Sequence, residues 1–423
     1  MINLKEYRFD ELYQMDSGIS TLKDQAGHGA PFVSFRDIYN NPILPDILTE
    51  KMDTSEEDQK RYSVKKGDVF LTRTSEVLDE LAMSSVAVKD YPKATFSGFA
   101  KRLRPVQENI TYDKFMAFYL RSIYFRKIIN AKATMTLRAS FNEQIFSYIK
   151  LLLPDYDTQV KIGDLFYIIE CKIRNNNIIC TELESMAETI YDYWFLQFEF
   201  PNEDGKPYKS SGGKMVWNEE LKKEIPKGWE DGTVEDVGEI VAGGTPSTEH
   251  PEYYCKSGIA WITPNDLSNL SDKYITHGER DISEIGLTNS SAKLMPKGTV
   301  LLTSRAPIGY IGIAINEVCT NQGFKSIVPN KKYGSEFIYY TIQKMVAYLR
   351  SLGTGSTFTE ISKNIVAQVK IVLPEKNVVN KFEKIISEIS SQRRILEEEN
   401  RELVSLRDFL LPLLMNGQVG FKN

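Results

Sequence analysis

An internal repeat constrains this chain more than any other feature of its sequence. The segment KKGDVFLTRTSEV (65–77) matches PKGTVLLTSRAPI (296–308), and RASFNEQIFSYIKLLLP (138–154) matches FTEISKNIVAQVKIVLP (358–374). Two shorter pairs belong to the same copies, FVSFRDI with WITPNDL and FSGFAKRLRP with TNQGFKSIVP. Because all four pairs occur in the same order, the sequence predicts two copies of one globular domain that differ in their polar loops.

A helical heptad pattern follows each copy. The seam of the first helix is Ile162, Phe166, Ile169, Ile173, Asn176, Cys180, Leu183, Ala187, Ile190 and Trp194. The seam of the second helix is Phe382, Ile386, Ile389, Arg393, Leu396, Asn400, Leu403, Arg407, Leu410 and Leu414. Heptads sustained over this length predict a coiled coil rather than a surface helix. Asn176 and Asn400 either fix the register of the pair or lie where an imperfect coil is frayed.

The two helices are expected to run antiparallel. Each globular copy lies at the N-terminus of its own helix, so antiparallel pairing ends the first helix where the second copy begins. A parallel pair would make residues 199–226 cross back along the coil, although PNEDGKPYKSSGGK has the Gly, Ser and Pro content of a loop.

The predicted fold class is therefore α+β, with two similar globular α/β heads separated by a two-helix antiparallel coiled coil. The predicted parts are the first head (1–154), a central spacer helix (155–198), a linker (199–226), the second head (227–374), a C-terminal spacer helix (375–416) and a tail (417–423). Two heads at opposite ends of such a spacer would be related by an approximate two-fold axis.

Composition restricts the function classes. The net charge of −5 argues against nucleic-acid binding over the whole chain, but residues 65–150 hold 15 Lys/Arg against 8 Asp/Glu. The four cysteines and three histidines are scattered without metal-ligand spacing, so no zinc site or disulfide framework is expected. No apolar run is long enough to cross a bilayer and the N-terminus has no signal-peptide pattern, so a cytoplasmic protein without a membrane partner is expected.

Several motifs resemble one family across essentially the whole chain. They are AGGTPST (242–248), IAWITPNDL (259–267), GTVLLTSRAPIG (298–309), YDYWFLQFEFPNEDGKPYKSSGGKMVW (191–217) and FLLPLLMNGQVG (409–420). In their order and duplication they are similar to the specificity subunits of type I restriction-modification enzymes. The first head departs from the family pattern, because SGISTLKDQAGHGAPF stands where a GGTPS element is usual.

The resemblance implies a non-catalytic subunit of a methyltransferase and endonuclease complex. Each head would be a target-recognition domain that reads half of an asymmetric, bipartite site in double-stranded DNA, with an unspecified spacer between the halves. Two methyltransferase subunits would dock on the helices, and up to two restriction and translocase subunits would join them. S-adenosylmethionine, ATP and magnesium would be bound by these partners, and no cofactor by this chain.

Candidate DNA contacts lie in the polar loops of both heads. Arg73 and Arg305 follow the apolar strands VFLT and VLLT, where a guanidinium can reach guanine, hold a phosphate or close the loop through an internal ion pair. Lys101 and Arg102 lie among apolar residues on a predicted strand, so part of this run faces solvent. Their charges either are simply solvated or contact the DNA backbone. The further candidates are Thr74, Ser75, Arg138, Thr245, Ser247, Asn321, Gln322, Lys325 and Ser356.

These further candidates have structural alternatives. Asn321 and Gln322 can read adenine or simply form a turn. The GGTPS element (243–247) lacks the Lys-Ser/Thr ending of a P-loop, so its amides either meet a DNA phosphate or form a structural turn. The hydroxyl-rich segment around Ser356 suits phosphate contact or helix capping.

Three aromatic residues at the end of the first helix form a candidate docking surface for the methyltransferase. They are Trp194, Phe195 and Phe198, and the alternative is that they pack against the second head.

Enzymatic alternatives fail on motifs. The chain has no [NDS]-P-P-[YFW] tetrad of a DNA amino-methyltransferase and no glycine-rich strand-turn for a cofactor. A second binding hypothesis remains, an adaptor whose heads bind protein instead of DNA, and it predicts partner binding that is insensitive to salt.

Overall fold

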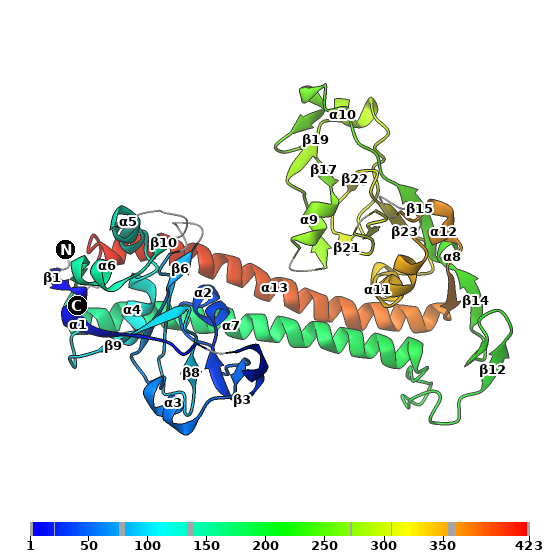
Figure 1. Ribbon diagram of the computed structural model, residues 1–423. Helices are drawn as coiled ribbons and strands as arrows, with labels where there is room; N and C mark the ends of the chain where they lie inside the picture. The colour runs from blue at the N-terminus through cyan, green and yellow to red at the C-terminus, as the bar shows by residue number, and fades with distance from the viewer. Residues whose placement is uncertain are drawn as a thin grey trace. The chain divides into compact units, whose positions relative to one another are not determined.

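Figure 1 shows the computed structural model of the chain. The structure describes residues 3–20, 22–75, 81–132, 139–270, 273–305, 307–353 and 360–420. It divides into two compact units, Met1–Ile178 with Leu396–Asn423 and Ile179–Ile395. Each unit contains one head together with a part of both long helices, and each is described here by itself.

Unit 1 contains the first head. Its first elements are β1 (Lys5–Arg8), α1 (Phe9–Leu12), β2 (Tyr13–Ser17), η1 (Lys23–Gln25), β3 (Ala26–Val33), α2 (Phe35–Asn40), β4 (Lys51–Met52), α3 (Glu56–Arg61), β5 (Val69–Thr72) and β6 (Thr74–Ser75). They are followed by β7 (Ser84–Val86), β8 (Thr95–Phe96), β9 (Ala100–Pro105), α4 (Asp113–Tyr119), α5 (Ile123–Lys132), β10 (Ala139–Ser140), α6 (Glu143–Tyr148), β11 (Lys150–Leu153) and the long helix α7 (Tyr156–Tyr191).

The first head is built around an antiparallel sheet in the order β2-β9-β5-β7. A smaller sheet, β4-β3-β8, carries a parallel pair, and β1 pairs with β11 where the chain enters α7. Helix α4 packs on α7, with the rings of Phe118 and Phe166 5.4 Å apart. The main core of the unit extends from these rings to Leu414 and Met415 of the second long helix, so that helix completes the core of the first head.

Unit 2 contains the second head. It begins, after the end of α7, with η3 (Asp192–Leu196, a π-helix), β12 (Met215–Asn218), β13 (Lys223–Pro226), β14 (Glu230–Thr233), α8 (Val234–Val237), β15 (Gly238–Ala242), η4 (Pro251–Tyr253), β16 (Tyr254–Cys255), β17 (Ile259–Ile262) and α9 (Pro264–Ser268). Its later elements are β18 (Tyr274–Ile275), β19 (Arg280–Ile282), α10 (Glu284–Thr288), β20 (Val300–Leu302), β21 (Ile311–Ala314), β22 (Val318–Thr320), β23 (Lys325–Pro329), α11 (Ser335–Ser351), α12 (Lys363–Ala367), β24 (Lys370–Leu373) and α13 (Lys376–Met415).

The second head repeats the topology of the first. Its larger sheet has the order β15-β23-β20-β21-β18, in which the first four strands correspond to β2-β9-β5-β7. The parallel pair β17 and β22 corresponds to β3 and β8, and β14 pairs with β24 as β1 pairs with β11. The prediction of two copies of one domain is confirmed.

Equivalent residues form equivalent local structure in the two heads. Gly67 and Gly298 both adopt φ +87 in the turn before β5 and β20, a left-handed conformation that favours glycine. Asn142 caps α6 by accepting from Ile145 N, and Ser362 caps α12 by accepting from Ile365 N. The repeated motifs therefore mark the positions where the backbone needs a particular residue type.

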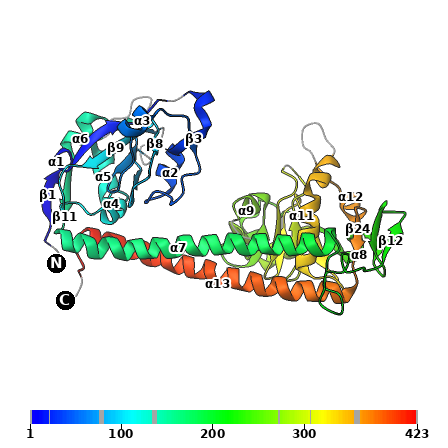
Figure 2. The same ribbon diagram turned by 90° about the horizontal axis from the view of Figure 1, so that it is seen from below.

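The two long helices lie side by side in each unit (Figure 2). In unit 1, Glu170 pairs with Arg407 at 3.4 Å, and Asn176 donates to Oδ1 of Asn400 at 2.9 Å. In unit 2, Glu184 pairs with Arg393. Higher numbers on α7 meet lower numbers on α13, so the predicted antiparallel pairing is confirmed, and no predicted seam position is exposed.

The predicted linker contains more structure than its composition indicated. Residues 201–214 form turns, as expected, but β12 and β13 form a hairpin that the sequence analysis did not predict. Met215 and Leu221 pack against the core of unit 2, and Ile225 belongs to that core. The segment 215–226 is therefore part of the second unit rather than a free linker.

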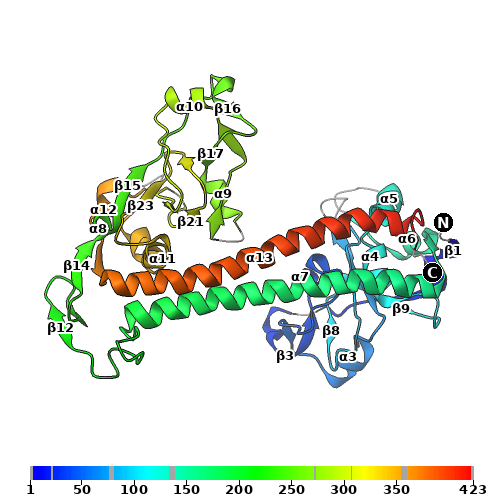
Figure 3. The same ribbon diagram turned by 180° about the vertical axis from the view of Figure 1, so that it is seen from behind.

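The second head is held to its helices by buried polar contacts. Figure 3 shows the ribbons of α7, α11 and α13, which supply most of these residues. Nζ of Lys273, with 2% of its side chain exposed, lies 2.9 Å from Oε2 of Glu336 in α11. The Tyr340 hydroxyl of α11 donates to Glu184 of α7 at 2.9 Å, and Glu383 of α13 accepts from Phe337 N at 2.8 Å. Such paired charges fix the geometry of the junction, because breaking one pair leaves a buried charge without compensation.

Candidate nucleic-acid interface

Three segments of the second head meet just after β20. Ser304 N donates to the carbonyl of Gly323 at 2.7 Å, and Ile361 N donates to the carbonyl of Ser304 at 2.9 Å. Arg305 forms an antiparallel bridge with Glu360. We call these segments the polar edge of the second head: residues 303–305, 321–325 and 360–361.

The first head has a polar edge with the same backbone hydrogen bonds. Arg73 N donates to the carbonyl of Phe99 at 2.8 Å, and Phe141 N donates to the carbonyl of Arg73 at 2.8 Å. Ser140 pairs with Thr74 in the β6–β10 ladder, as Glu360 pairs with Arg305. The polar edge of the first head comprises residues 72–74, 97–101 and 140–141. One backbone frame thus presents different side chains in the two heads.

The cations of the second polar edge share one carboxylate. Nε of Arg305 lies 3.0 Å from Oε2 of Glu360, and Nζ of Lys325 lies 3.3 Å from Oε1 of the same residue. Burial opposes ionisation of Glu360, but the hydrogen bonds from Arg305 and Lys325 outweigh it and lower the pKa of its carboxyl. Arg305 keeps 46% of its side chain exposed, and Lys325 only 10%.

This geometry corrects the prediction for Lys325. Its ammonium lies behind Glu360 and also contacts Oγ of Ser304 at 3.3 Å, so it stabilises the polar edge from within instead of facing a ligand. Arg305 stays a candidate contact, and the internal ion pair that was its alternative is present as well.

The cations of the first polar edge have different contacts. Arg73 is exposed, and Lys101 is half-buried with Nζ donating to Oγ of Ser17 at 2.8 Å. Burial lowers the pKa of Lys101, and the nearby charge of Arg73 lowers it further, although Glu143 and Asp16 raise it. Within the described part of the chain, neither of them forms an ion pair. Thr74 and Ser75 form β6 beside them.

Arg102 belongs to the core of the first head rather than to its surface. Its guanidinium donates to Oδ2 of Asp16 and to the carbonyl of Ser63, both at 2.7 Å, and lies over the Phe96 ring. With 6% of its side chain exposed, it is not accessible to DNA. The prediction of a DNA contact at Arg102 is wrong, because the inward face of β9 receives this residue.

The GGTPS element is a packed turn. Gly244 N donates to the carbonyl of Thr320 at 2.8 Å, and Trp261 Nε1 donates to the carbonyl of Gly244 at 3.1 Å. A Cβ on Gly243 would lie 2.0 Å from the carbonyl oxygen of Asn321, so only glycine fits there. Since Gly243 N also bonds to the protein, the structure favours a structural turn over an amide cradle for phosphate.

The turn nevertheless supplies side chains to the second polar edge. The Thr245 hydroxyl donates to Oε1 of Gln322, which is exposed. Oδ1 of Asn321 accepts from Gly323 N at 2.9 Å and shapes the loop. Ser247 is exposed, and its Oγ accepts from Glu249 N at 3.3 Å. The structure therefore brings Thr245 and Gln322 together, as two candidates from distant parts of the sequence.

Two candidates cannot be placed. Arg138 and Ser356 lie outside the described residues, although the segments that contain them lead into Ser140 and Glu360 of the two polar edges.

The aromatic candidates for docking are buried. Trp194, Phe195 and Phe198 have 6%, 4% and 5% of their surface exposed, and they pack in the core of unit 2. The ring of Phe195 lies 5.0 Å from that of Phe382 and 4.9 Å from that of Phe337. The prediction that they form a docking surface is wrong, because the second head and α13 cover them.

Other apolar side chains on the long helices are exposed instead. They are Ile168, Ile178, Leu406 and Phe409 in unit 1 and Ile179, Met186, Leu196 and Ile395 in unit 2, each at least 45% exposed. These positions lie outside the heptad seam, and an apolar residue off the seam is the signal that could have identified them.

Two residues of the polar edges were also missed. Glu360 ends the segment GTGSTFTE, in which only the hydroxyl groups were predicted to contact DNA. Phe99 lies in a turn after Gly98, at the position where the second copy has Gly323. In both cases the aligned copies differ at one position. Glu360 of the second copy aligns with Ser140 of the first, and Phe99 of the first copy aligns with Gly323 of the second.

The described residues contain no other evident reactive centre. No group of three or more His, Cys, Asp or Glu side chains in this part of the chain is arranged to hold a metal ion. None of the four cysteines, all of which the structure describes, forms a disulfide. Within the same residues, none of the helices combines the length and the apolar composition that are required to span a bilayer.

Comparison with known families agrees with the duplicated geometry. The type I restriction modification DNA specificity domain matches this chain twice, over residues 1–200 and 226–404. The chain belongs to this specificity family. Each match covers one head and the greater part of the helix that follows it, so the structural repeat is a repeat of the family's domain.

Relatives within the family are specificity subunits. The type I restriction enzyme MjaIX specificity subunit of Methanocaldococcus jannaschii is 40% identical over 203 residues, covering 45% of this chain and 47% of that protein, so the match spans about half of its length. The type I restriction enzyme HindI specificity subunit of Haemophilus influenzae is 24% identical over 443 residues, 92% of this chain and 94% of that protein.

A solved structure shares the fold. The crystal structure of the type I restriction-modification system S subunit from M. genitalium superposes with a TM-score of 0.63 at 14% identity, covering 98% of this chain and 96% of the other. The specificity domain is thus repeated on a fold already observed in an S subunit.

Proposed function

We propose that this specificity-family chain reads an asymmetric, bipartite site in double-stranded DNA, one half with each head, and leaves the spacer between the halves unread. The observation that carries the proposal is the pair of polar edges. They share one backbone frame, but Arg73 and Thr74 of the first head occupy the positions of Ser304 and Arg305 in the second, and Ser140 occupies the position of Glu360. Different side chains on one frame suit the reading of different bases.

The chain acts as the non-catalytic subunit of its complex. Two methyltransferase subunits dock on the long helices, and up to two restriction and translocase subunits join for cleavage. The exposed apolar side chains of α7 and α13 in both units support this docking, because aromatic residues and Met are enriched in protein interfaces, and Phe409 and Met186 are among these side chains. The partner subunits bind S-adenosylmethionine, ATP and magnesium. The complex works in the cytoplasm.

The test combines the purified chain with its methyltransferase subunit, S-adenosylmethionine and a library of random DNA. The chain alone is expected to transfer no methyl group, and the complex is expected to methylate adenine in products that share two fixed half-sites. Methyl transfer by the chain alone, or products without a common sequence, would contradict the proposal.

Salt distinguishes this function from a protein adaptor. The cations of the polar edges release counterions when they meet phosphates, so the affinity of the complex for its site should fall steeply as salt rises. A binding constant that is flat between low and moderate salt would favour the adaptor.

A further inference from the structure

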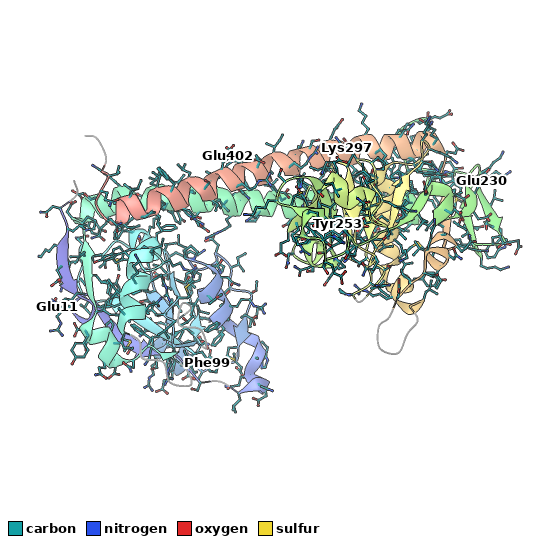
Figure 4. All side chains as sticks on the ribbon, turned by 90° about the horizontal axis from the view of Figure 1, so that it is seen from above. Glu11, Phe99, Glu230, Tyr253, Lys297 and Glu402 are labelled. Carbon is teal, nitrogen blue, oxygen red and sulfur yellow. The ribbon has the colours of Figure 1, made fainter. Side chains whose placement is uncertain are left out.

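Phe99 is an exposed aromatic ring on a rigid loop of the first polar edge. Its relative exposure is 68%, although an aromatic side chain of this size is usually buried. Figure 4 shows it on the side of the first head that lies away from α7 and α13. The ring is not a member of the hydrophobic core of the first head.

The backbone around Phe99 is fixed on both sides. Gly98 N donates to the carbonyl of Ile19 at 2.8 Å, and Phe99 N donates to Oγ of Ser97 at 3.2 Å. The carbonyl of Phe99 accepts from Arg73 N at 2.8 Å, and Ala100 N donates to the carbonyl of Ser97 at 2.9 Å. A ring held in this way loses little conformational entropy when it meets a ligand.

Two cationic residues are neighbours of Phe99 along the backbone of the polar edge. Arg73 is joined to it by the backbone hydrogen bond, and Lys101 follows two residues later. In the second head, Gly323 replaces the ring, and Glu360 neutralises the cations. Among the described residues, the first polar edge therefore carries an exposed ring with Arg73 and Lys101 as backbone neighbours, whereas the second has Gly323 at the position of the ring.

We propose that Phe99 is a specificity-determining residue of the first head, and that its ring packs against the 5-methyl group of a thymine in the major groove. The proposal rests on the proposed function. The two cations favour a polyanion, and the thymine methyl is the apolar feature that a base pair presents in the major groove. Wedging the ring between base pairs would require unstacking of the duplex, which a contact with a methyl group does not.

The test uses the complex of the full chain with its methyltransferase subunit and measures methylation of its own site. Phe99→Ala is expected to lower the rate at low DNA concentration by about 5- to 30-fold through loss of the apolar contact. Phe99→Leu keeps an apolar side chain and should retain most of the rate. The matched control is Tyr148→Ala, which removes an aromatic ring of the same head that is 66% exposed and lies outside the polar edge.

Uracil in place of thymine identifies the contact. At one thymine of the first half-site, uracil should lower the rate of the wild-type complex as much as Phe99→Ala does, and should lower the variant no further. Uracil at thymines of the second half-site should not reproduce this pattern. An unchanged rate for Phe99→Ala, or a loss that no uracil reproduces, would overturn the inference while leaving sequence-specific methylation intact. A wild-type complex that methylates no specific site would instead overturn the proposed function.

Discussion

Glu360 offsets part of the positive charge of the second polar edge. It pairs with Arg305 and Lys325 together, whereas Ser140 occupies its position in the first head. An exposed ion pair contributes little to stability, so Arg305 can exchange Glu360 for a DNA group at low cost. If the second head binds DNA as proposed, the carboxylate holds the guanidinium in place until DNA replaces it.

Replacing Arg305 by Ala should weaken recognition of the half-site read by the second head. A lost guanine contact costs about 1–3 kcal/mol and relaxes the preference at one base pair, without change in the other half-site. Sequencing of methylated library products measures both effects. Lys297→Ala is the control, because this exposed lysine precedes β20 while Arg305 follows it (Figure 4).

The effect of Arg305→Ala has two components, because Glu360 loses its arginine partner when Arg305 is removed. Arg305→Ala leaves an unpaired carboxylate beside DNA, so the double variant Arg305→Ala/Glu360→Gln separates repulsion from the lost contact. An equal loss on all sequences would reassign Arg305 to a phosphate.

A second residue-scale difference lies beneath the heads. Glu383 of α13 accepts from Phe337 N, and at the equivalent place in α7 the first head has Gly163, packed against Phe115. Burial, reinforced by the charge of Glu336, raises the pKa of Glu383 from 4.5 to about 7, although Lys273 lowers it. The folded protein therefore binds this proton more tightly than the unfolded chain.

The sign of the pH dependence follows from that difference. The contribution of Glu383 to the free energy of unfolding should fall as the pH rises from about 4.5 to about 7, and stay constant above this range. Glu383→Gln should stabilise unit 2 by about 1–3 kcal/mol at pH 8 and leave its stability unchanged near pH 4.5. Denaturant unfolding across this range measures the difference. An equal effect at both pH values, or the same profile for the exposed control Glu388→Gln, would contradict the assignment.

At the scale of elements, the long helices show what sequence can and cannot predict. The seam positions were predicted because heptad periodicity is a local property, repeated along one helix. The burial of Trp194, Phe195 and Phe198 was not predicted, because it depends on residues far away in the sequence, such as Phe337 and Phe382. Arg102 and Lys325 were misjudged for the same reason, since Asp16 and Glu360 become their partners only in the folded heads.

The polar edges show the same division. The strands VFLT and VLLT, their glycine turns and the following polar residues could be read from the repeat. The hydrogen bonds that bring residues 304, 323 and 361 together join segments with no local signal. Candidate residues were therefore found by position, while their partners required the structure.

The length of the helix pair should set the gap between the half-sites. Inserting one heptad after Ile178 in α7 and another after Glu398 in α13 keeps the seam in phase, because seven residues approximate two turns. The insertion adds up to about 10 Å at about 1.5 Å per residue, or at most about three base pairs. Sequencing of methylated products should show unchanged half-sites and a gap longer by about one to three base pairs.

The control for this experiment carries the heptad in α7 alone. Such an insertion displaces Asn176 and the residues before it relative to Asn400, so this variant should lose the helix pairing and its activity. A paired-insertion variant that stays active with an unchanged gap would show that the helices do not set the distance.

At the scale of the whole molecule, the duplicated family domain predicts that the heads can be exchanged. Pro154 and Pro374 lie at equivalent junctions, after β11 and β24 and before the long helices. A hybrid with the second head of a relative should keep one half-site and acquire the other half-site of the donor. The methylated sequences of the hybrid complex test this directly. Loss of the first half-site from a folded hybrid that still binds its methyltransferase would contradict independent reading by the two heads.

The core of unit 1 has a consequence for how the protein is made. Leu414 and Met415 pack with Phe115 and Phe166, so the first head is finished by residues that leave the ribosome after the whole second head. During synthesis, the apolar face of α7 in unit 1 therefore stays uncovered until the C-terminal part of α13 has been made. A premature stop before residue 396 would accordingly damage the head that was translated first, and leave the later one with its own core.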